Sequence, residues 1–99
     1  MEERIAYKLM QQSLEMSYDE VDITRFGPAT SDDRAHEYIS ADARILDAYD
    51  AVAYVDGEQA VFGLCAYMNE DGETCAVAYD DSSVLQEFGP EDIEEAEDD

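Results

Sequence analysis

The chain has 99 residues, of which 27 are Asp or Glu and only five are Lys or Arg, so its formal net charge is −22. Nucleic acids and anionic membrane surfaces should repel such a chain, which argues against direct binding to DNA, RNA or lipid and favours a basic protein as partner. The apolar fraction of 45% is within the range of chains that fold, and the length suits one hydrophobic core.

The negative charge is spread over the whole chain. Residues 91–99 hold seven acids in nine positions, and we expect them to form an acidic, disordered tail. Residues 1–90 keep 20 acids against five bases, a net charge of −15, and form the one domain that we expect. Because like charges at this density oppose folding, the acidity of the folded part suggests a function for it.

The sequence lacks the features of a membrane or secreted protein. No apolar run approaches the roughly 18–20 residues needed to span a bilayer, and the first residues, Met-Glu-Glu-Arg, are acidic where a signal peptide is basic. We therefore expect a cytoplasmic protein, located in the host cytoplasm if a phage encodes it.

The N-terminal part predicts a helix followed by a short strand. Apolar residues recur at spacings of three and four over residues 3–17, and Glu2 and Glu3 are favourably placed at a helix N-terminus. Residues 20–26 then alternate with period two and are stopped by Gly27-Pro28, which predicts a strand.

The next segment predicts more helix. Ser31-Asp32-Asp33 has the composition of a helix start, and apolar residues continue at helical spacing to residue 49. In one unbroken helix Asp42 would lie on the apolar face, where an unpaired carboxylate costs several kcal/mol. We therefore predict a break at Ser40 and a separate helix over residues 41–49.

From residue 51 the pattern predicts an antiparallel sheet. Residues 51–55, 59–68 and 74–79 are rich in Val, Phe, Tyr and small apolar residues, and turn sequences separate them at Asp56-Gly57 and at 69–72. The prediction is an α+β fold in which a three-stranded meander over about 51–79 packs against the N-terminal helices. Both faces of the middle strand are apolar, so the face left open would meet a partner or a second copy in a homodimer.

Catalytic and metal-binding motifs are weak. His36 is the only histidine, and Cys65 and Cys75 have neither a redox nor a zinc spacing, so we expect two buried, reduced thiols. Residues 69–72 resemble part of a calcium loop, but Tyr67 and Ala78 would occupy ligand positions that require acids. We expect no enzyme activity, no metal and no cofactor.

The distribution of acids carries the functional prediction. Close groups of carboxylates bracket the predicted elements, among them Asp32, Asp33 and Glu37, then Asp47 and Asp50, then Glu70, Asp71 and Glu73. Carboxylates on adjacent turn positions, or four residues apart on a helix, can imitate neighbouring phosphates of DNA. In size, charge and acidic C-terminus the chain resembles the phage-encoded DNA mimics that inhibit restriction or CRISPR nucleases, although no motif carries over residue by residue. The resemblance implies an inhibitor of a basic nuclease or other DNA-binding protein, and the candidate contacts are Asp32, Asp33, Glu37, Asp47, Asp50, Glu70, Asp71 and Glu73.

Two other hypotheses explain the same acidity. A halophilic cytosolic protein of any function carries excess Asp and Glu with little Lys, and this chain has a single Lys. An acidic adaptor or chaperone for a basic protein, such as a histone or a ribosomal or replication factor, would also be strongly negative. A requirement for molar salt in folding would distinguish the halophilic protein from the mimic.

Overall fold

The computed structural model describes residues 1–30, 35–39 and 42–98. In chain order its elements are α1 (Glu3–Ser17), β1 (Val21–Pro28), the 3₁₀ helix η1 (Ala35–Glu37), β2 (Arg44–Val55), β3 (Glu58–Met68), β4 (Thr74–Tyr79), β5 (Val84–Phe88) and α2 (Pro90–Glu97). The strands form one antiparallel sheet in the order β1-β2-β3-β4-β5. The α+β class is confirmed, but the sheet has five strands where we predicted a three-stranded meander and a separate short strand over residues 20–26.

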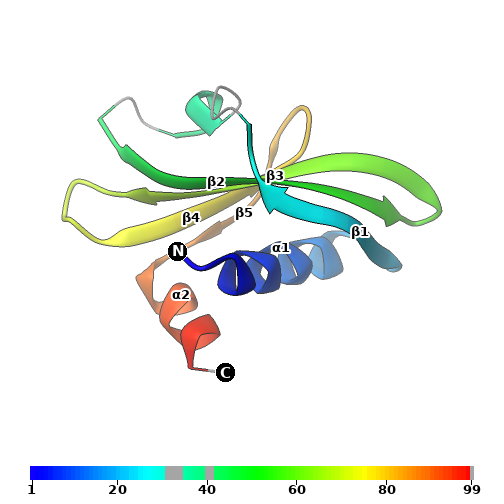
Figure 1. Cartoon of the computed structure of the whole chain (residues 1–99), viewed down its shortest axis with the longest axis horizontal. Coiled ribbons are helices and arrows are strands. Elements are labelled where there is room, and N and C mark those ends of the chain that lie inside the picture. Colours follow the sequence, from blue (N-terminus) through cyan, green and yellow to red (C-terminus); the bar gives the residue numbers. More distant parts are fainter. Residues whose placement is uncertain (31–34, 40–41, 99) are drawn as a thin grey trace.

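Both α-helices lie on one face of the sheet (Figure 1). The predicted helix over residues 3–17 is confirmed as α1, and its buried residues Leu9, Met10 and Leu14 share one apolar cluster with Phe62 and Leu64 of β3. The 3.6-residue period of α1 and the two-residue period of β3 each direct one apolar stripe into the same core, so the two local patterns reinforce each other.

The opposite face of the sheet is covered in part. Ala35 of η1 is buried in a second, smaller cluster with Cys65, Val77 and Tyr79, and the Tyr38 ring stacks on the Tyr79 ring at a centroid distance of 4.8 Å. Figure 1 places η1 on the side of the sheet away from α1. Both faces of β3 are therefore used in the fold.

The predicted turns between the strands are confirmed. Asp56 and Gly57 have φ values of 52° and 87°, as a two-residue hairpin turn requires, and Val55 pairs with Glu58 across them. The Asp56 carboxylate also accepts the backbone N–H groups of Asp19 and Glu20 at 3.1 and 2.9 Å. This turn is therefore tied to the connection between α1 and β1.

The predicted helix over residues 41–49 is wrong, because Arg44–Val55 forms the strand β2. The ladder between β2 and β3 shifts its register between Ile45 and Asp47, so Leu46 is an extra residue in a β-bulge. The bulge places two apolar residues next to each other and breaks the two-residue alternation. The apolar positions then match a helical spacing although the chain is extended.

The C-terminal segment also differs from the expected disordered tail, because Pro90–Glu97 forms α2. Pro90 and the acids of the first turn suit a helix start, and the Asp92 carboxylate accepts the Gly89 N–H at 3.0 Å. Ile93 is buried at 5% exposure in the main core, and Lys8 of α1 donates to the Ala96 carbonyl at 3.2 Å. Ile93, together with the partly buried Ala96 packed against the same core, docks a short helix that is otherwise acidic.

Strand β5 (Val84–Phe88) was not predicted either. It has five residues, two of them Gln86 and Glu87, and its pairing with β4 shifts register between Ala78 and Tyr79. Phe88 is 1% exposed and anchors the strand in the main core. A short, half-polar strand with a bulge has too little periodicity to be read from its own sequence.

Candidate interaction surface

The turn between β3 and β4 presents three of the predicted contact acids on ordered backbone. Glu70, Asp71 and Glu73 are all exposed. The Asn69 side-chain oxygen accepts the backbone N–H groups of Asp71 and Glu73 at 3.0 and 2.9 Å, and Gly72 has the positive φ of 81° that the turn needs. The three carboxylates therefore project from a fixed loop.

The outer face of the sheet carries two more of the predicted acids. Asp50 is exposed on β2 and pairs in register with Gly63, and Glu37 is exposed on η1 above the same face. The remaining predicted members of the Glu37 group, Asp32 and Asp33, lie outside the described residues.

Asp47 and Asp50, which we grouped as neighbours, lie on opposite faces of the sheet because β2 is a strand. Asp47 is on the side of the helices, where its carboxylate pairs with the terminal ammonium of Met1 at 2.6 Å. The Tyr49 hydroxyl donates to the Met1 carbonyl at 2.8 Å, and burial with the nearby Asp47 and Glu3 charges raises the Tyr49 pKa. Asp47 thus holds the start of α1 against β2 and is a poor candidate for partner contact.

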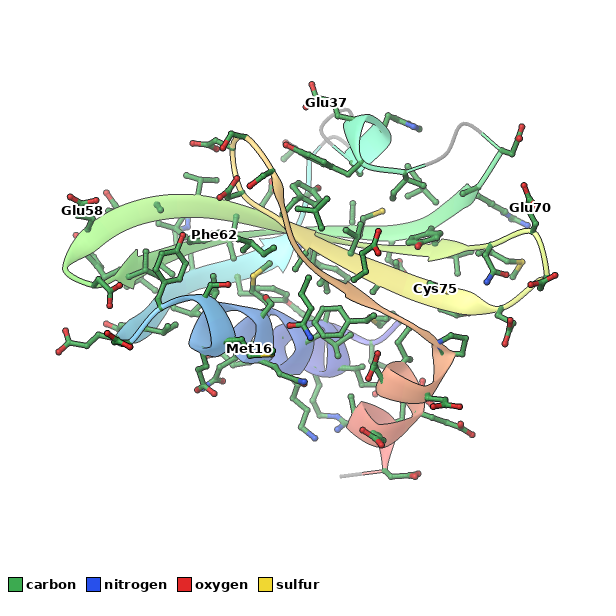
Figure 2. All side chains as sticks on the ribbon, turned by 180° about the vertical axis from the view of Figure 1, so that it is seen from behind. Met16, Glu37, Glu58, Phe62, Glu70 and Cys75 are labelled. Carbon is green, nitrogen blue, oxygen red and sulfur yellow. The ribbon has the colours of Figure 1, made fainter. Side chains whose placement is uncertain are left out.

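Acids are also found at both ends of the long strand β3. Figure 2 shows Glu58 beside the turn at one end and Glu70 in the turn at the other. The 11 residues of β3 span roughly 33 Å at the rise of a strand. Carboxylates are therefore distributed along the length of the sheet and do not gather at one spot.

The two cysteine thiols lie in the interior of the fold. Cys65 and Cys75 are buried, and burial, with the nearby Glu73 charge, raises the pKa of the Cys75 thiol despite a hydrogen bond from Asn69. A protonated, buried thiol is a poor nucleophile. Across residues 1–30, 35–39 and 42–98, no group of three or more His, Cys, Asp or Glu side chains is arranged to hold a metal ion.

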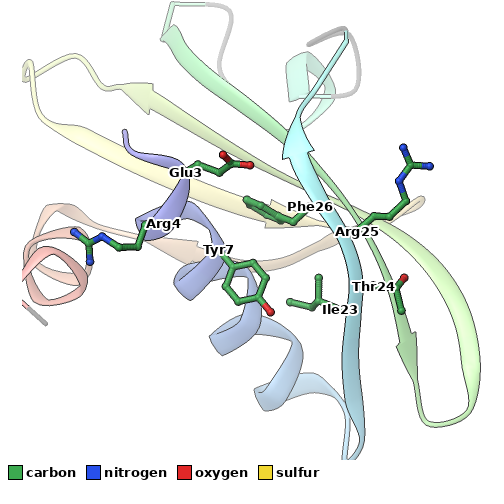
Figure 3. A pocket seen from close by; sticks show the side chains of 7 residues that line it. All are labelled: Glu3, Arg4, Tyr7, Ile23, Thr24, Arg25 and Phe26. Carbon is green, nitrogen blue, oxygen red and sulfur yellow. The ribbon is translucent and has the colours of Figure 1, made fainter.

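Sequence reasoning missed a groove at the edge of the sheet. This open groove of about 460 Å³ has an apolar part formed by Tyr7 of α1 and by Ile23 and Phe26 of β1, and its other lining residues are Glu3, Arg4, Thr24 and Arg25. The Tyr7 and Phe26 rings meet edge to face at 5.4 Å. Figure 3 shows Ile23 and Phe26 pointing toward α1, and Thr24 and Arg25 pointing away from it. The strand pattern at 20–26 was visible, but its position at the edge was not.

In the part of the chain that the structure describes, no helix is both long and apolar enough to cross a membrane. No protein-family model, curated protein or solved structure matches the chain.

Proposed function

We propose that this protein is a non-enzymatic inhibitor that binds a basic nucleic-acid-binding protein in place of DNA, as an anti-restriction or anti-CRISPR protein would. The observation that carries the proposal is the linear density of charge. A net charge of −22 on a body 40 Å long gives one negative charge per about 1.8 Å, and B-form DNA carries one per about 1.7 Å of its axis. Averaged over all its faces, the body therefore carries about as much charge per unit length as the duplex that a channel lined with Lys and Arg binds.

Several of the acids lie on well-ordered backbone, which supports the same proposal. The acids at 70, 71 and 73 sit on a turn fixed by Asn69, and Asp50 sits within a paired strand. Carboxylates held on an ordered backbone lose less conformational entropy on binding than those of a flexible tail. The proposed contact set is therefore Glu37, Asp50, Glu70, Asp71 and Glu73, and the predicted contacts Asp32 and Asp33 belong to the same hypothesis.

A competition assay tests the proposal. The protein is titrated into complexes of a fluorescent DNA duplex with restriction endonucleases and RNA-guided nucleases, and displacement of the duplex is measured. We expect displacement of at least one of them, weakening steeply with added salt because the contacts are ionic. If no DNA-binding protein releases its duplex at about 0.1 M salt, the proposal is overturned.

Charge reversal locates the surface. Changing Glu70, Asp71 and Glu73 together to Lys should weaken competition by at least tenfold, on the order of 1.4 kcal/mol. The matched control changes Glu94, Glu95 and Glu97, which are exposed on α2, to Lys, because this alters the net charge by the same amount as the change at the turn. Lysines in the last turns of a helix also favour the helix dipole, so the control should stay folded. Equal loss in both variants would mean that total charge, and not this surface, drives binding.

The salt requirement for folding separates the mimic from halophilic adaptation. A mimic has to fold in ordinary cytoplasm, so circular dichroism in about 10 mM buffer should show the helix and strand content of the structure and a cooperative thermal transition. A chain that gains structure only near molar salt would support halophilic adaptation. A folded chain that binds a basic protein without displacing DNA from it would support the adaptor hypothesis.

A further inference from the structure

The outer edge of β1 has backbone groups with hydrogen-bonding capacity directed away from the sheet. Two backbone hydrogen bonds show which residues of β1 bond to β2 and which are directed to the free edge. The Asp56 N–H donates to the Glu20 carbonyl and the Ala29 N–H donates to the Ala48 carbonyl, each at 2.9 Å. Pairing continues inward from each end to a register shift between Ile23 and Arg25. Because antiparallel pairs alternate, the N–H and C=O groups of Ile23 and Phe26 point to the free edge.

The charge at this edge is closer to balance than the charge of the rest of the molecule. Arg25 and Asp22 are exposed on β1, and Arg4 and Glu3 line the adjoining groove from α1 (Figure 3). Arg4 also pairs with the exposed Glu2 at 3.3 Å, so two bases lie beside three acids here, in a chain where acids outnumber bases by 27 to five. A basic partner would meet two arginines here, so this edge does not suit the partner of the proposed function.

We propose that the edge of β1 pairs with a second copy of the chain, antiparallel across a twofold axis between Thr24 and Arg25. In this register Ile23 lies opposite Phe26 of the second copy, and both present their free backbone groups to each other. Both side chains are on the face of the helices, so the apolar parts of the two grooves meet. Pro28, which has no N–H to donate, falls opposite Val21 at the end of the ladder and removes one terminal bond.

The charges of β1 are complementary in the same register. Asp22 and Arg25 share the outer face of the sheet, since they pair with Tyr54 and Val52 of β2. Across the twofold axis Asp22 is diagonal to Arg25 of the second copy, a separation that long side chains span. The pair occurs twice, once on each side of the axis.

The salt dependence of this dimer is opposite to that of the proposed inhibitor complex. Two bodies of charge −22 repel each other, and salt screens the repulsion as the Debye length falls from about 10 Å at 0.1 M to about 3 Å at 1 M. Dimerisation should therefore strengthen with salt, whereas binding to a basic channel should weaken. The dimer does not depend on the proposed function, and either can fail alone.

Sedimentation velocity over a concentration series at both salt concentrations tests the dimer. We expect a monomer–dimer equilibrium that shifts toward dimer at 1 M NaCl, with amide hydrogen exchange at Ile23 and Phe26 slowing as concentration rises. A monomer at every concentration and both salt levels overturns the proposal, and so does a dimer in which these two amides exchange as in the monomer.

Charge exchange at the edge tests the register. Arg25→Asp and Asp22→Arg should each weaken self-association at least tenfold, because each places like charges across the axis. An equal mixture of the two variants should form a heterodimer, and the double variant should associate like the wild type. The control is Arg44→Asp, an exposed residue on β2 with the same change in net charge, which should have little effect. If Arg44→Asp weakens the dimer as much as Arg25→Asp, or the mixture stays monomeric, this pairing is wrong.

Discussion

The two faces of the sheet share five strands but contain very different cores. Beneath α1 and α2 lies a large apolar cluster that includes Leu9, Phe62 and Phe88, each 1% exposed or less. On the outer face the buried cluster is small and confined to the region under η1, and Tyr54 and Val61 beyond it are 46% and 41% exposed. Because stabilisation scales with buried apolar area, the helix face should supply most of the stability and leave the outer face available for contacts.

The largest expected effect lies on the helix face. Leu9→Ala removes a fully buried side chain from the main cluster and should lower the free energy of unfolding by about 3 kcal/mol, because it leaves a cavity. Denaturant titration measures this change in the free energy of unfolding, and we expect the m-value to stay unchanged. Met16→Ala in the same helix is the control, since Met16 is 71% exposed and should change stability by less than about 0.5 kcal/mol. Similar losses in the two variants would contradict the division between the faces.

A smaller effect is expected where the outer face is tightly packed. A Cβ on Gly63 would overlap the Tyr79 ring, so Gly63→Ala should destabilise the fold by about 2 kcal/mol through overpacking. In a Tyr79→Leu background most of this loss should disappear, which a double-mutant cycle measures. Gly27→Ala is the control, because the nearest atom to its Cβ would be 3.9 Å away. A full loss that persists without the Tyr79 ring would mean that backbone strain is the cause.

The smallest effect concerns the loop between β4 and β5. Burial acts to raise the pKa of Asp80, but hydrogen bonds from the backbone N–H and hydroxyl groups of Ser82 and Ser83 outweigh it and lower the pKa below its usual 3.8. A lowered pKa in the folded state means that the carboxylate stabilises the fold above the unfolded pKa, and that this contribution is lost as the pH falls through the folded value.

Asp80→Ala should therefore cost about 1 kcal/mol at pH 7. The difference between variant and wild type should shrink as the pH is lowered from 7 through the folded pKa. Thermal unfolding across this range measures it, and a difference that does not vary with pH would show that the ionised carboxylate is not responsible.

The candidate interaction regions differed in how far local sequence could predict their structure. The acidic turn at Glu70, Asp71 and Glu73 was predicted correctly because Asn, Asp and Gly favour turns through their own backbone chemistry. The grouping of Asp47 with Asp50 was wrong, because it assumed a helix where β2 places the two on opposite faces. The groove beside β1 could not be predicted at all, since it exists only where α1 crosses an edge strand.

What the sequence determined by itself is what depends on near neighbours in the chain: the period of α1, the turn at Asp56-Gly57 and the excess of acids. Tertiary structure alone decided the bulge at Leu46, the docking of α2 through Ile93 and the position of β1 at the edge. Each of these is set by a surface contributed from elsewhere in the chain. Packing against such a surface lowers the free energy of the folded chain. Where this gain exceeds the cost of an unfavourable local propensity, a strand can accommodate an extra residue and an acidic segment can become a helix.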